Sequence, residues 1–274
     1  MKNSIIVIGG GESGVGAAYL ASKNGYNVFL SEFNTIEKKY KKILDDNQIN
    51  YEEGGHTLNK FFNANEVIKS PGVSNNSDII LKIKSKNIPV ISEIEFAFRF
   101  NNSILIGVTG SNGKTTTCSL IHHILKSSGK SVGLAGNIGN SFSFLTAENN
   151  FEYVVLELSS FQLDDVIDFN PFISIITNLT PDHLERYDSS FQNYVNSKFK
   201  IISNHSSSDY FIYNNDDDKI NSEISNRNIK SIKIPFSFTN SSQDNLTYVE
   251  NNNINSNINN TNFMIPIENL SIKG

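Results

Sequence analysis

The stretch Gly107–Thr116 reads Gly-Val-Thr-Gly-Ser-Asn-Gly-Lys-Thr-Thr and carries the residue types that bind phosphate. It lies between an apolar run typical of a buried strand, Ile104–Val108, and an apolar-periodic run typical of a helix, Cys118–Leu125. A glycine-rich turn in this context wraps backbone N–H groups around a triphosphate. The Lys114 ammonium would reach the β and γ oxygens, and the Thr115 hydroxyl would bind Mg²⁺. The pattern predicts an ATP or GTP site; the alternative is an ordinary glycine-rich turn.

The loop is a variant of the common phosphate-binding pattern. That pattern has a glycine five residues before the Gly-Lys pair, where this chain has Val108. The residues predicted to bind the nucleotide are Gly110, Ser111, Asn112, Gly113, Lys114, Thr115 and Thr116.

A second glycine-rich turn, Gly9–Gly14, contains G-x-G-x-x-G between a predicted strand and a predicted helix. Glu32, at the end of the next strand, is the kind of acid that such sites direct at a ribose. NAD, FAD or any nucleotide diphosphate would fit this turn, and tight helix–strand packing is the alternative without a ligand. The Ser70–Val73 turn is predicted at the same sheet edge. Two nucleotide-type sites suggest that one binds ATP and the other a nucleotide-linked substrate.

Further polar residues follow predicted strands. Glu157 ends an apolar strand, where phosphate-loop proteins hold Mg²⁺; an exposed carboxylate at a strand end is the alternative. The segment Asn178–Arg186 follows the next strand, so it is placed for ligands at the carboxyl edge of the sheet. Within it, His183 could bind metal or phosphate, or could be solvated. Lys198, on a predicted helix, has solvation as its default interpretation.

Composition narrows the class of protein. The chain has 274 residues and a net charge of −5, which gives no reason to expect nucleic acid as a partner. No apolar run is long enough to insert into a membrane. The single cysteine, Cys118, excludes an intramolecular disulfide, fits a reducing cytoplasm, and is expected to be a small buried residue.

Alternating strand-like and helix-like segments predict an α/β fold with parallel sheets. We expect a Rossmann-like domain over residues 1–100 and an ATP-binding α/β domain, incomplete at its end, over residues 101–274. The polar stretch Thr239–Asn262 is expected to be a long loop or weak hairpin. Strands are predicted at 4–8, 27–31, 66–69, 89–91, 104–108, 153–158, 173–177, 210–213 and 231–234. Helices are predicted at 14–24, 35–46, 78–86, 93–100, 118–125 and 191–203.

Taken together, these segments resemble the Mur ligases, and among them the branch that adds D-glutamate. The variant phosphate loop is the form found in that family. The motifs run in family order across nearly the whole chain. They are GGGESGVGAA (9–18), KSPGV (69–73), SEIEFAF (92–98), VTGSNGKTTT (108–117), GNIG (136–139), ELSSFQL (157–163), NLTPDHLERY (178–187) and SKFKI (197–201).

The resemblance implies an ATP-dependent ligase of peptidoglycan synthesis, monomeric and located in the bacterial cytoplasm. ATP would convert the carboxylate of UDP-N-acetylmuramoyl-L-alanine into an acyl phosphate, which the amine of D-glutamate would attack. Lys114 would hold the γ-phosphate, Thr115 and Glu157 one Mg²⁺, and His183 with a carbamylated Lys198 a second. Asn137 would contact the substrate near the acyl group, with His183 nearby. The other implied substrate-binding residues are Ser13, Gly14, Ser31, Glu32, Ser70, Pro71 and Gly72.

The sequence departs from the family pattern at its end. A G-x-H-N motif and a third, D-glutamate-binding domain would follow Gly274, so we expect this chain to be unable to complete amide formation alone and to be marginally stable. Two alternatives stay open, a non-catalytic fragment that binds UDP-sugar and ATP, and a folylpolyglutamate-type ligase. An NAD-dependent oxidoreductase is disfavoured by the phosphate loop.

Overall fold

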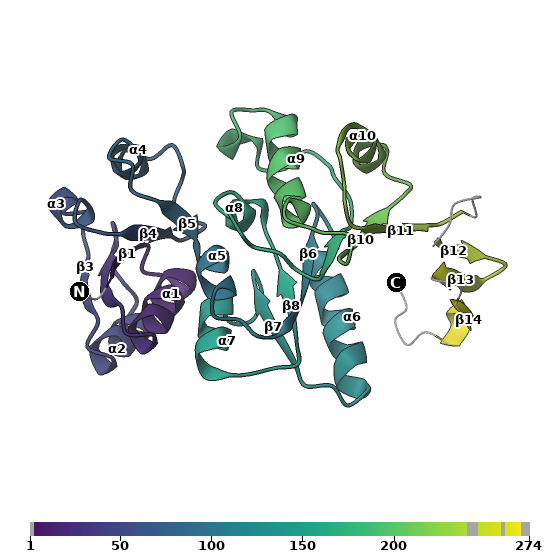
Figure 1. The fold of residues 1–274 in the computed structure, drawn as a ribbon, viewed down its shortest axis with the longest axis horizontal. Helices are drawn as coiled ribbons and strands as arrows, with labels where there is room; N and C mark the ends of the chain where they lie inside the picture. The colour runs from purple at the N-terminus through teal and green to yellow at the C-terminus, as the bar shows by residue number, and fades with distance from the viewer. Residues whose placement is uncertain (1–2, 240–245, 259–260, 270–274) are drawn as a thin grey trace.

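The computed structural model describes residues 3–239, 246–258 and 261–269. Two sheets stand side by side with helices packed on them, and the α/β expectation is confirmed (Figure 1). We call the elements β1 to α5 the N-terminal unit and the elements β6 to β14 the C-terminal unit. The predicted domain boundary after residue 100 stays a prediction; the first sheet ends with Ser92 and the second begins with Ile104.

The N-terminal unit has a five-stranded parallel sheet in the order β3-β2-β1-β4-β5. Its central strand is buried from Ile5 to Ile8. A continuous apolar run is typical of a parallel strand that is covered on both faces. The strands are β1 (Ser4–Ile8), β2 (Asn27–Ser31), β3 (Asn50–Glu52), β4 (Glu66–Lys69) and β5 (Val90–Ser92). The helices are α1 (Glu12–Lys23), α2 (Lys38–Asp46), α3 (Leu58–Phe61), α4 (Asp78–Lys84) and α5 (Glu93–Phe98).

The C-terminal unit has a nine-stranded sheet in the order β14-β13-β12-β11-β10-β9-β6-β8-β7. It is parallel from β7 to β12, and β12, β13 and β14 are antiparallel. Its first strands are β6 (Ile104–Thr109), β7 (Val132–Gly136), β8 (Tyr153–Glu157), β9 (Ile173–Ile176) and β10 (Tyr210–Asn214). The others are β11 (Ile232–Ser237), β12 (Thr247–Glu250), β13 (Asn253–Ile258) and β14 (Thr261–Pro266). The α-helices are α6 (Lys114–Ser127), α7 (Phe142–Glu148), α8 (Ser160–Leu163), α9 (Phe191–Phe199) and α10 (Asp218–Asn226). Short 3-10 helices are η1 (Leu184–Arg186), η2 (Lys200–Ile202) and η3 (Ile267–Asn269).

The structure corrects several predicted elements. Strands β3 and β7 and helices α3, α7, α8 and α10 were not predicted. Helix α6 begins at Lys114 rather than Cys118, and α9 ends at Phe199, where a 3-10 turn replaces its expected last turn. For 239–262 a long loop or a weak hairpin was predicted; among the described residues the hairpin alternative is confirmed by the antiparallel pair β12–β13, the loop alternative is wrong, and β14 extends the hairpin to a three-stranded ladder. Residues 240–245 and 259–260 lie outside the described residues.

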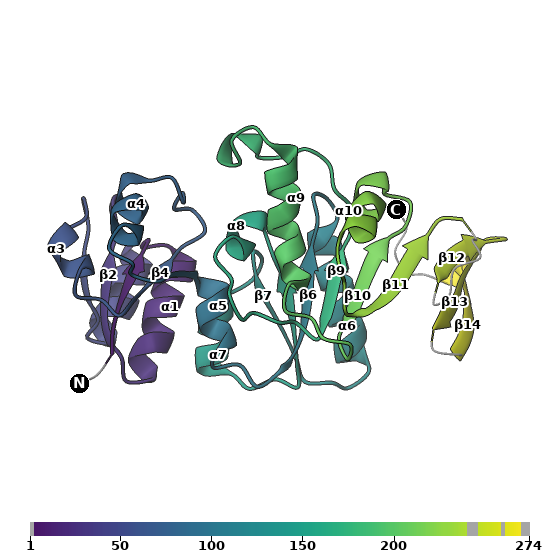
Figure 2. The same cartoon turned by 45° about the horizontal axis from the view of Figure 1, so that its top comes forward.

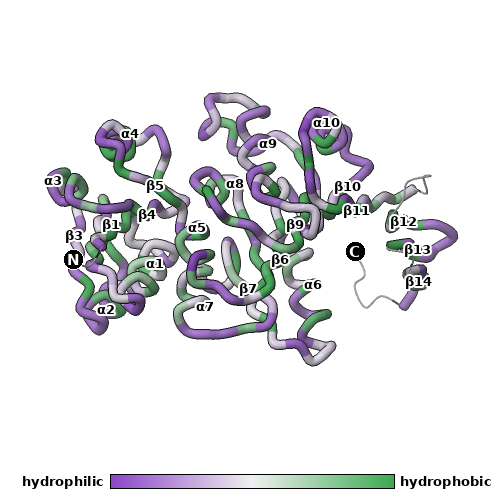
Figure 3. Tube along the Cα trace, in the orientation of Figure 1, coloured by the Kyte–Doolittle hydropathy of each residue, from purple (hydrophilic) through white to green (hydrophobic). Residues whose placement is uncertain are grey.

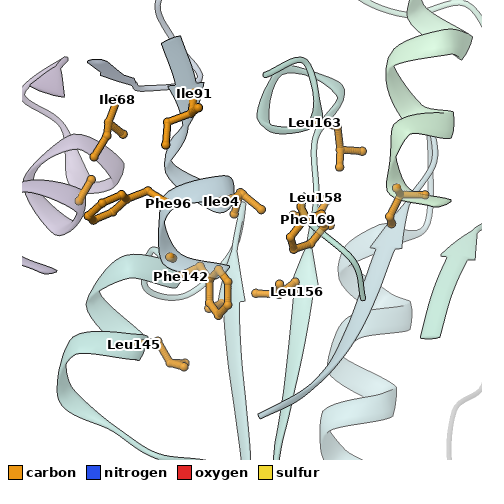
Figure 4. Close-up of a cluster of buried hydrophobic side chains, with 14 of the residues drawn as sticks. Ile68, Ile91, Ile94, Phe96, Phe142, Leu145, Leu156, Leu158, Leu163 and Phe169 are labelled. Carbon is orange, nitrogen blue, oxygen red and sulfur yellow. The ribbon is translucent and has the colours of Figure 1, made fainter. Parts of the chain in front are cut away.

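One hydrophobic cluster crosses from the N-terminal unit to the C-terminal unit. Figure 4 shows Ile94 and Phe96 of α5 between Ile68 of the first sheet and Phe142 of α7. The same cluster continues to Leu156 on β8. Figure 2 shows α5 and α7 between the two sheets. The two units therefore share part of their core.

Hydrophobic residues concentrate along the strands, whereas the outer turns are largely hydrophilic (Figure 3). Cys118 is fully buried, as expected, and burial raises the pKa of its thiol to about 12. Among the described residues, no helix combines the length and the apolar character needed to cross a bilayer.

Candidate functional site

The phosphate loop joins β6 to α6 through two glycines in left-handed conformations. Gly110 has φ of +141°, and a Cβ there would lie 2.0 Å from Thr177 Oγ1. Gly113 has φ of +80° and precedes the first residue of α6. Both positions require glycine, since side chains rarely adopt such angles and Gly110 has no room for one. The loop thus leads directly into the positive end of the α6 dipole, which favours an anion.

Residues that follow β9 hold the loop in place through backbone and side-chain atoms. The Ser111 hydroxyl donates to the Thr180 carbonyl at 2.8 Å, and the Asn112 N–H donates to Asn178 Oδ1 at 2.9 Å. Lys114 Nζ lies over the same turn and donates to the carbonyls of Gly110 (2.9 Å) and Ser111 (2.8 Å). The ammonium predicted to meet phosphate is therefore at the loop.

Glu157 brings the strand end and the helix start together. Val108 on β6 is paired with Glu157 on β8, so the carboxylate lies beside the start of the phosphate loop. Its Oε2 accepts the Thr115 hydroxyl at 2.7 Å, and its Oε1 accepts Asn137 Nδ2 at 2.8 Å. Glu157 is 2% exposed, so the alternative of a solvated strand-end carboxylate is wrong. Three predicted site residues, Thr115, Asn137 and Glu157, meet at one point.

Lys198 is buried, contrary to its default interpretation as a solvated lysine. It is 2% exposed, and its Nζ donates to the Gly110 carbonyl at 2.8 Å and lies over the Tyr194 ring. Burial, and secondarily the nearby Lys114 ammonium, lower the pKa of Lys198 to about 7, although Asp182 opposes this. A lysine with this pKa is largely neutral in mildly alkaline solution and is then nucleophilic.

His183 is exposed in the loop after β9 and has a left-handed backbone, φ +51°. Its ring lies 5.3 Å from the Phe161 ring and 3.7 Å from carboxylate oxygens of Asp182 and Glu185. No contact joins His183 to Lys198 among the described hydrogen bonds and ion pairs. Thr116 is exposed in the first turn of α6. His183 and Lys198, predicted to bind a second Mg²⁺, are therefore not in contact, whereas Thr115 and Glu157, predicted to bind the first, are.

A cleft of about 440 Å³ opens at the carboxyl edge of the first sheet. Glu32 shapes it, because its Oε2 accepts the Gly10 N–H at 2.5 Å and its Oε1 accepts the Asn34 N–H at 2.7 Å. Residues on its wall are Ile8, Gly9, Gly11, Glu12, Ser13, Glu32, Phe33, Asn34, His56, Ser70, Pro71, Gly72 and Val73. The residues predicted for a UDP-linked substrate thus line one cleft, apart from Gly14, Ser31, Asn137 and His183.

Two of those predicted residues act behind the cleft wall. A Cβ on Gly14 would lie 1.9 Å from the Gly9 carbonyl oxygen, so this glycine permits close packing of α1 on its loop. Ser31 is fully buried, and its hydroxyl lies 2.8 Å from Glu52 Oε1 and 2.7 Å from His56 Nδ1. His56 itself lines the cleft, and burial lowers its pKa. Sequence reasoning missed His56 because strand β3, which leads to it, was not recognised.

The donor set at Glu157 suits magnesium better than a softer metal. Carboxylate and hydroxyl oxygens are the ligands that Mg²⁺ prefers, and the Thr115 oxygen keeps lone pairs after donating to Glu157. Within residues 3–239, 246–258 and 261–269, no group of three or more His, Cys, Asp or Glu residues could hold a metal ion. A divalent cation would therefore need oxygens from phosphate or water as well.

Comparison with known proteins assigns the family. The family model of the Mur ligase middle domain matches residues 108–273, and that of the MurD N-terminal domain matches residues 4–79. The chain belongs to the Mur ligase family. The resemblance read from the motifs is confirmed, and the cleft and phosphate loop lie in the matched N-terminal and middle domains respectively.

Relatives of this Mur ligase chain are named UDP-N-acetylmuramoylalanine--D-glutamate ligase. The protein of Christiangramia forsetii is 48% identical over 274 residues, which are 100% of this chain and 61% of that protein. The protein of Bacteroides fragilis is 48% identical over 250 residues, 91% of this chain and 56% of that protein. The chain therefore spans about three fifths of the length of these relatives.

Solved structures agree on the fold of this Mur ligase chain. The UDP-N-acetylmuramate:L-alanyl-gamma-D-glutamyl-meso-diaminopimelate ligase (MPL) from Neisseria meningitides superposes with a TM-score of 0.63 at 16% identity, covering 97% of this chain and 87% of that one. The UDP-N-acetylmuramate-alanine ligase MurC from Thermotoga maritima gives 0.54 at 20% identity, covering 97% and 61%. At these identities the similarity shows the fold alone.

Proposed function

We propose that this chain binds UDP-N-acetylmuramoyl-L-alanine and ATP for a ligase that adds D-glutamate in bacterial peptidoglycan synthesis. The observation that carries the proposal is the cluster of Thr115, Asn137 and Glu157 at the phosphate loop. The cleft beside the Gly9–Gly14 loop, in the same chain, supports a nucleotide-linked substrate. The names of the relatives support D-glutamate as the added amino acid.

The residues fit a nucleoside triphosphate with Mg²⁺. ATP would supply the phosphoryl group that activates the alanyl carboxylate, and the D-glutamate amine would then form the amide. Lys114 and the α6 N-terminus would neutralise phosphate charge, which is the main requirement of phosphoryl transfer. Thr115 and Glu157 would hold one Mg²⁺, and Asn137 would orient the Glu157 carboxylate toward it.

Lys198 supports a further part of the proposal. Its lowered pKa, about 7, makes the neutral amine available, and only the neutral amine can add CO₂ to form a carbamate. The carbamate would carry the negative oxygens that a second Mg²⁺ requires, with His183 as its partner. Incubation with ¹³C-bicarbonate should give a carbamate carbonyl signal that is absent from Lys198→Met, with Lys200→Met as the matched control.

Calorimetry tests the function directly. We expect binding of UDP-N-acetylmuramoyl-L-alanine, and separate Mg²⁺-dependent binding of a non-hydrolysable ATP analogue. Binding of NADH instead of the UDP-linked ligand would contradict the proposal. Binding of both nucleotides without any phosphorylation of the alanyl carboxylate would favour a non-catalytic role for this chain.

A further inference from the structure

The wall of the cleft formed by Ser70–Val73 is only partly fixed by its own unit. The Ser70 N–H donates to the Ile8 carbonyl, and the Val73 N–H donates to the Ser70 carbonyl, each at 3.0 Å. The carbonyls of Pro71, Gly72 and Val73 are held differently, because they accept hydrogen bonds from a side chain of the C-terminal unit.

That side chain is Arg186, at the end of η1. One guanidinium nitrogen, Nη2, lies 3.2 Å from the Pro71 carbonyl and 3.4 Å from the Val73 carbonyl. The other, Nη1, lies 3.5 Å from the Gly72 carbonyl. The planar guanidinium can reach several acceptors at once because its donors form a fixed fork.

An aromatic platform fixes the guanidinium itself. Its central carbon lies 4.2 Å from the centre of the Phe161 ring, which stacks on Tyr187 at 5.9 Å. A cation over an aromatic face is attracted to it. Arg186 is therefore held on one side by Phe161 and on the other by the cleft wall.

A buried ion pair reinforces the same contact. Lys69 Nζ lies 2.9 Å from Asp165 Oδ2 and donates to the Val73 carbonyl at 3.0 Å. The two side chains are 1% and 8% exposed. Asp165 belongs to the C-terminal unit, so two residues of that unit, Arg186 and Asp165, act on the same turn.

Peptide geometry connects these contacts to the ligand. In a trans peptide the carbonyl and the following N–H point in opposite directions. When the Pro71 carbonyl is directed to Arg186, the Gly72 N–H is directed away from Arg186, and Gly72 is a residue of the cleft lining. Backbone N–H groups of this kind are what a diphosphate requires.

We propose that Arg186 is a positioning residue, which holds the Ser70–Val73 wall in the conformation that binds the diphosphate of a UDP-linked substrate. The inference rests on the proposed function, and it assigns to a residue of the C-terminal unit a role at the cleft of the N-terminal unit. The ATP site does not depend on this role.

The test compares Arg186→Met and Arg186→Lys with the control Arg227→Met. Arg227 is a matched residue, since it also lies over an aromatic ring, Phe199, at 4.6 Å, and it pairs with Glu223 on α10. We expect about tenfold weaker binding of UDP-N-acetylmuramoyl-L-alanine to Arg186→Met, because charge-assisted hydrogen bonds are lost. Arg186→Lys should be weakened nearly as much, because an ammonium lacks the fork. Affinity for an ATP analogue, and both affinities of Arg227→Met, should stay unchanged.

Amide hydrogen exchange provides the readout that needs no ligand. The Val73 amide should exchange faster in Arg186→Met than in the parent chain, because its turn has lost three contacts. Full affinity of Arg186→Met, full rescue by Arg186→Lys, or an unchanged Val73 exchange rate would each overturn the proposal. If the parent chain fails to bind the UDP-linked ligand, the proposed function fails, and the exchange rate alone decides whether Arg186 positions the wall.

Discussion

Glu93 gives the sharpest prediction, because it is a carboxyl buried where α5 meets α7. It is 1% exposed, and its Oε1 accepts the Ser143 N–H at 2.5 Å, while its Oε2 has no hydrogen-bond partner among the described residues. Burial raises its pKa from 4.5 to about 7, and the Glu12 carboxylate adds to the effect; hydrogen bonds from Ser143 oppose it.

The sign of the pH dependence follows from proton binding. Between pH 4.5 and 7 the folded chain keeps the Glu93 proton and the unfolded chain releases it. The contribution of Glu93 to the unfolding free energy is therefore largest below pH 4.5 and is lost as the pH rises through 7. A shift from 4.5 to about 7 corresponds to about 3 kcal/mol of unfolding free energy.

The substitution Glu93→Gln keeps the shape and the acceptor for Ser143 but cannot titrate. Between pH 4.5 and pH 8 the unfolding free energy of the parent chain should fall by about 3 kcal/mol more than that of the variant. Urea denaturation at both pH values measures this difference. Glu148→Gln, at the other end of α7, is the control, since a hydrogen bond from Lys23 lowers the pKa of Glu148. Parallel pH curves for Glu93→Gln and the parent chain would refute the reasoning.

Three further predictions concern the C-terminal unit. Lys114→Ala should weaken binding of an ATP analogue about tenfold or more and leave the UDP-linked ligand unaffected; calorimetry that shows equal ATP affinity would remove the role given to Lys114. Gly110→Ala should abolish binding of an ATP analogue and lower the unfolding free energy by about 1–3 kcal/mol, because a Cβ would meet Thr177 and the backbone would be strained. A melting curve equal to that of the parent chain would contradict this. Burial lowers the pKa of His205, so the parent chain should lose stability as the pH falls below 6.5, and His205→Gln should show a weaker loss in acid denaturation.

The sequence predicted the site best where polar residues stand at the ends of predicted strands. Glu157 and Thr115 were predicted to meet because parallel strands end at one edge of a sheet and the phosphate loop starts at that edge. Lys198 could not be placed in the same way, since a lysine in an amphipathic helix gives no signal of burial. Its environment depends on Tyr194, one turn earlier on the same helix, and on Gly110, which is distant in sequence and reaches Lys198 only in the folded chain.

The missed elements have physical reasons as well. Strand β7 reads Val-Gly-Leu-Ala-Gly, and glycine and alanine carry little strand propensity; its pairing with β8 stabilises it instead. Strands β12, β13 and β14 lie in a stretch of sequence rich in asparagine, which is typical of loops, yet cross-strand hydrogen bonding joins them in a ladder. In both cases tertiary pairing outweighs local preference.

The shared hydrophobic cluster limits how this protein can be divided. Separation of the chain between residues 100 and 101 would divide this cluster, because α5 packs against α7 across the two units and the cluster contains residues of both helices. Recombination between relatives should therefore succeed when α5 and α7 are exchanged together and fail when a junction separates them. The segment between α5 and β6 is short, but the part of the chain that can be exchanged as a unit is set by the packing of α5 on α7.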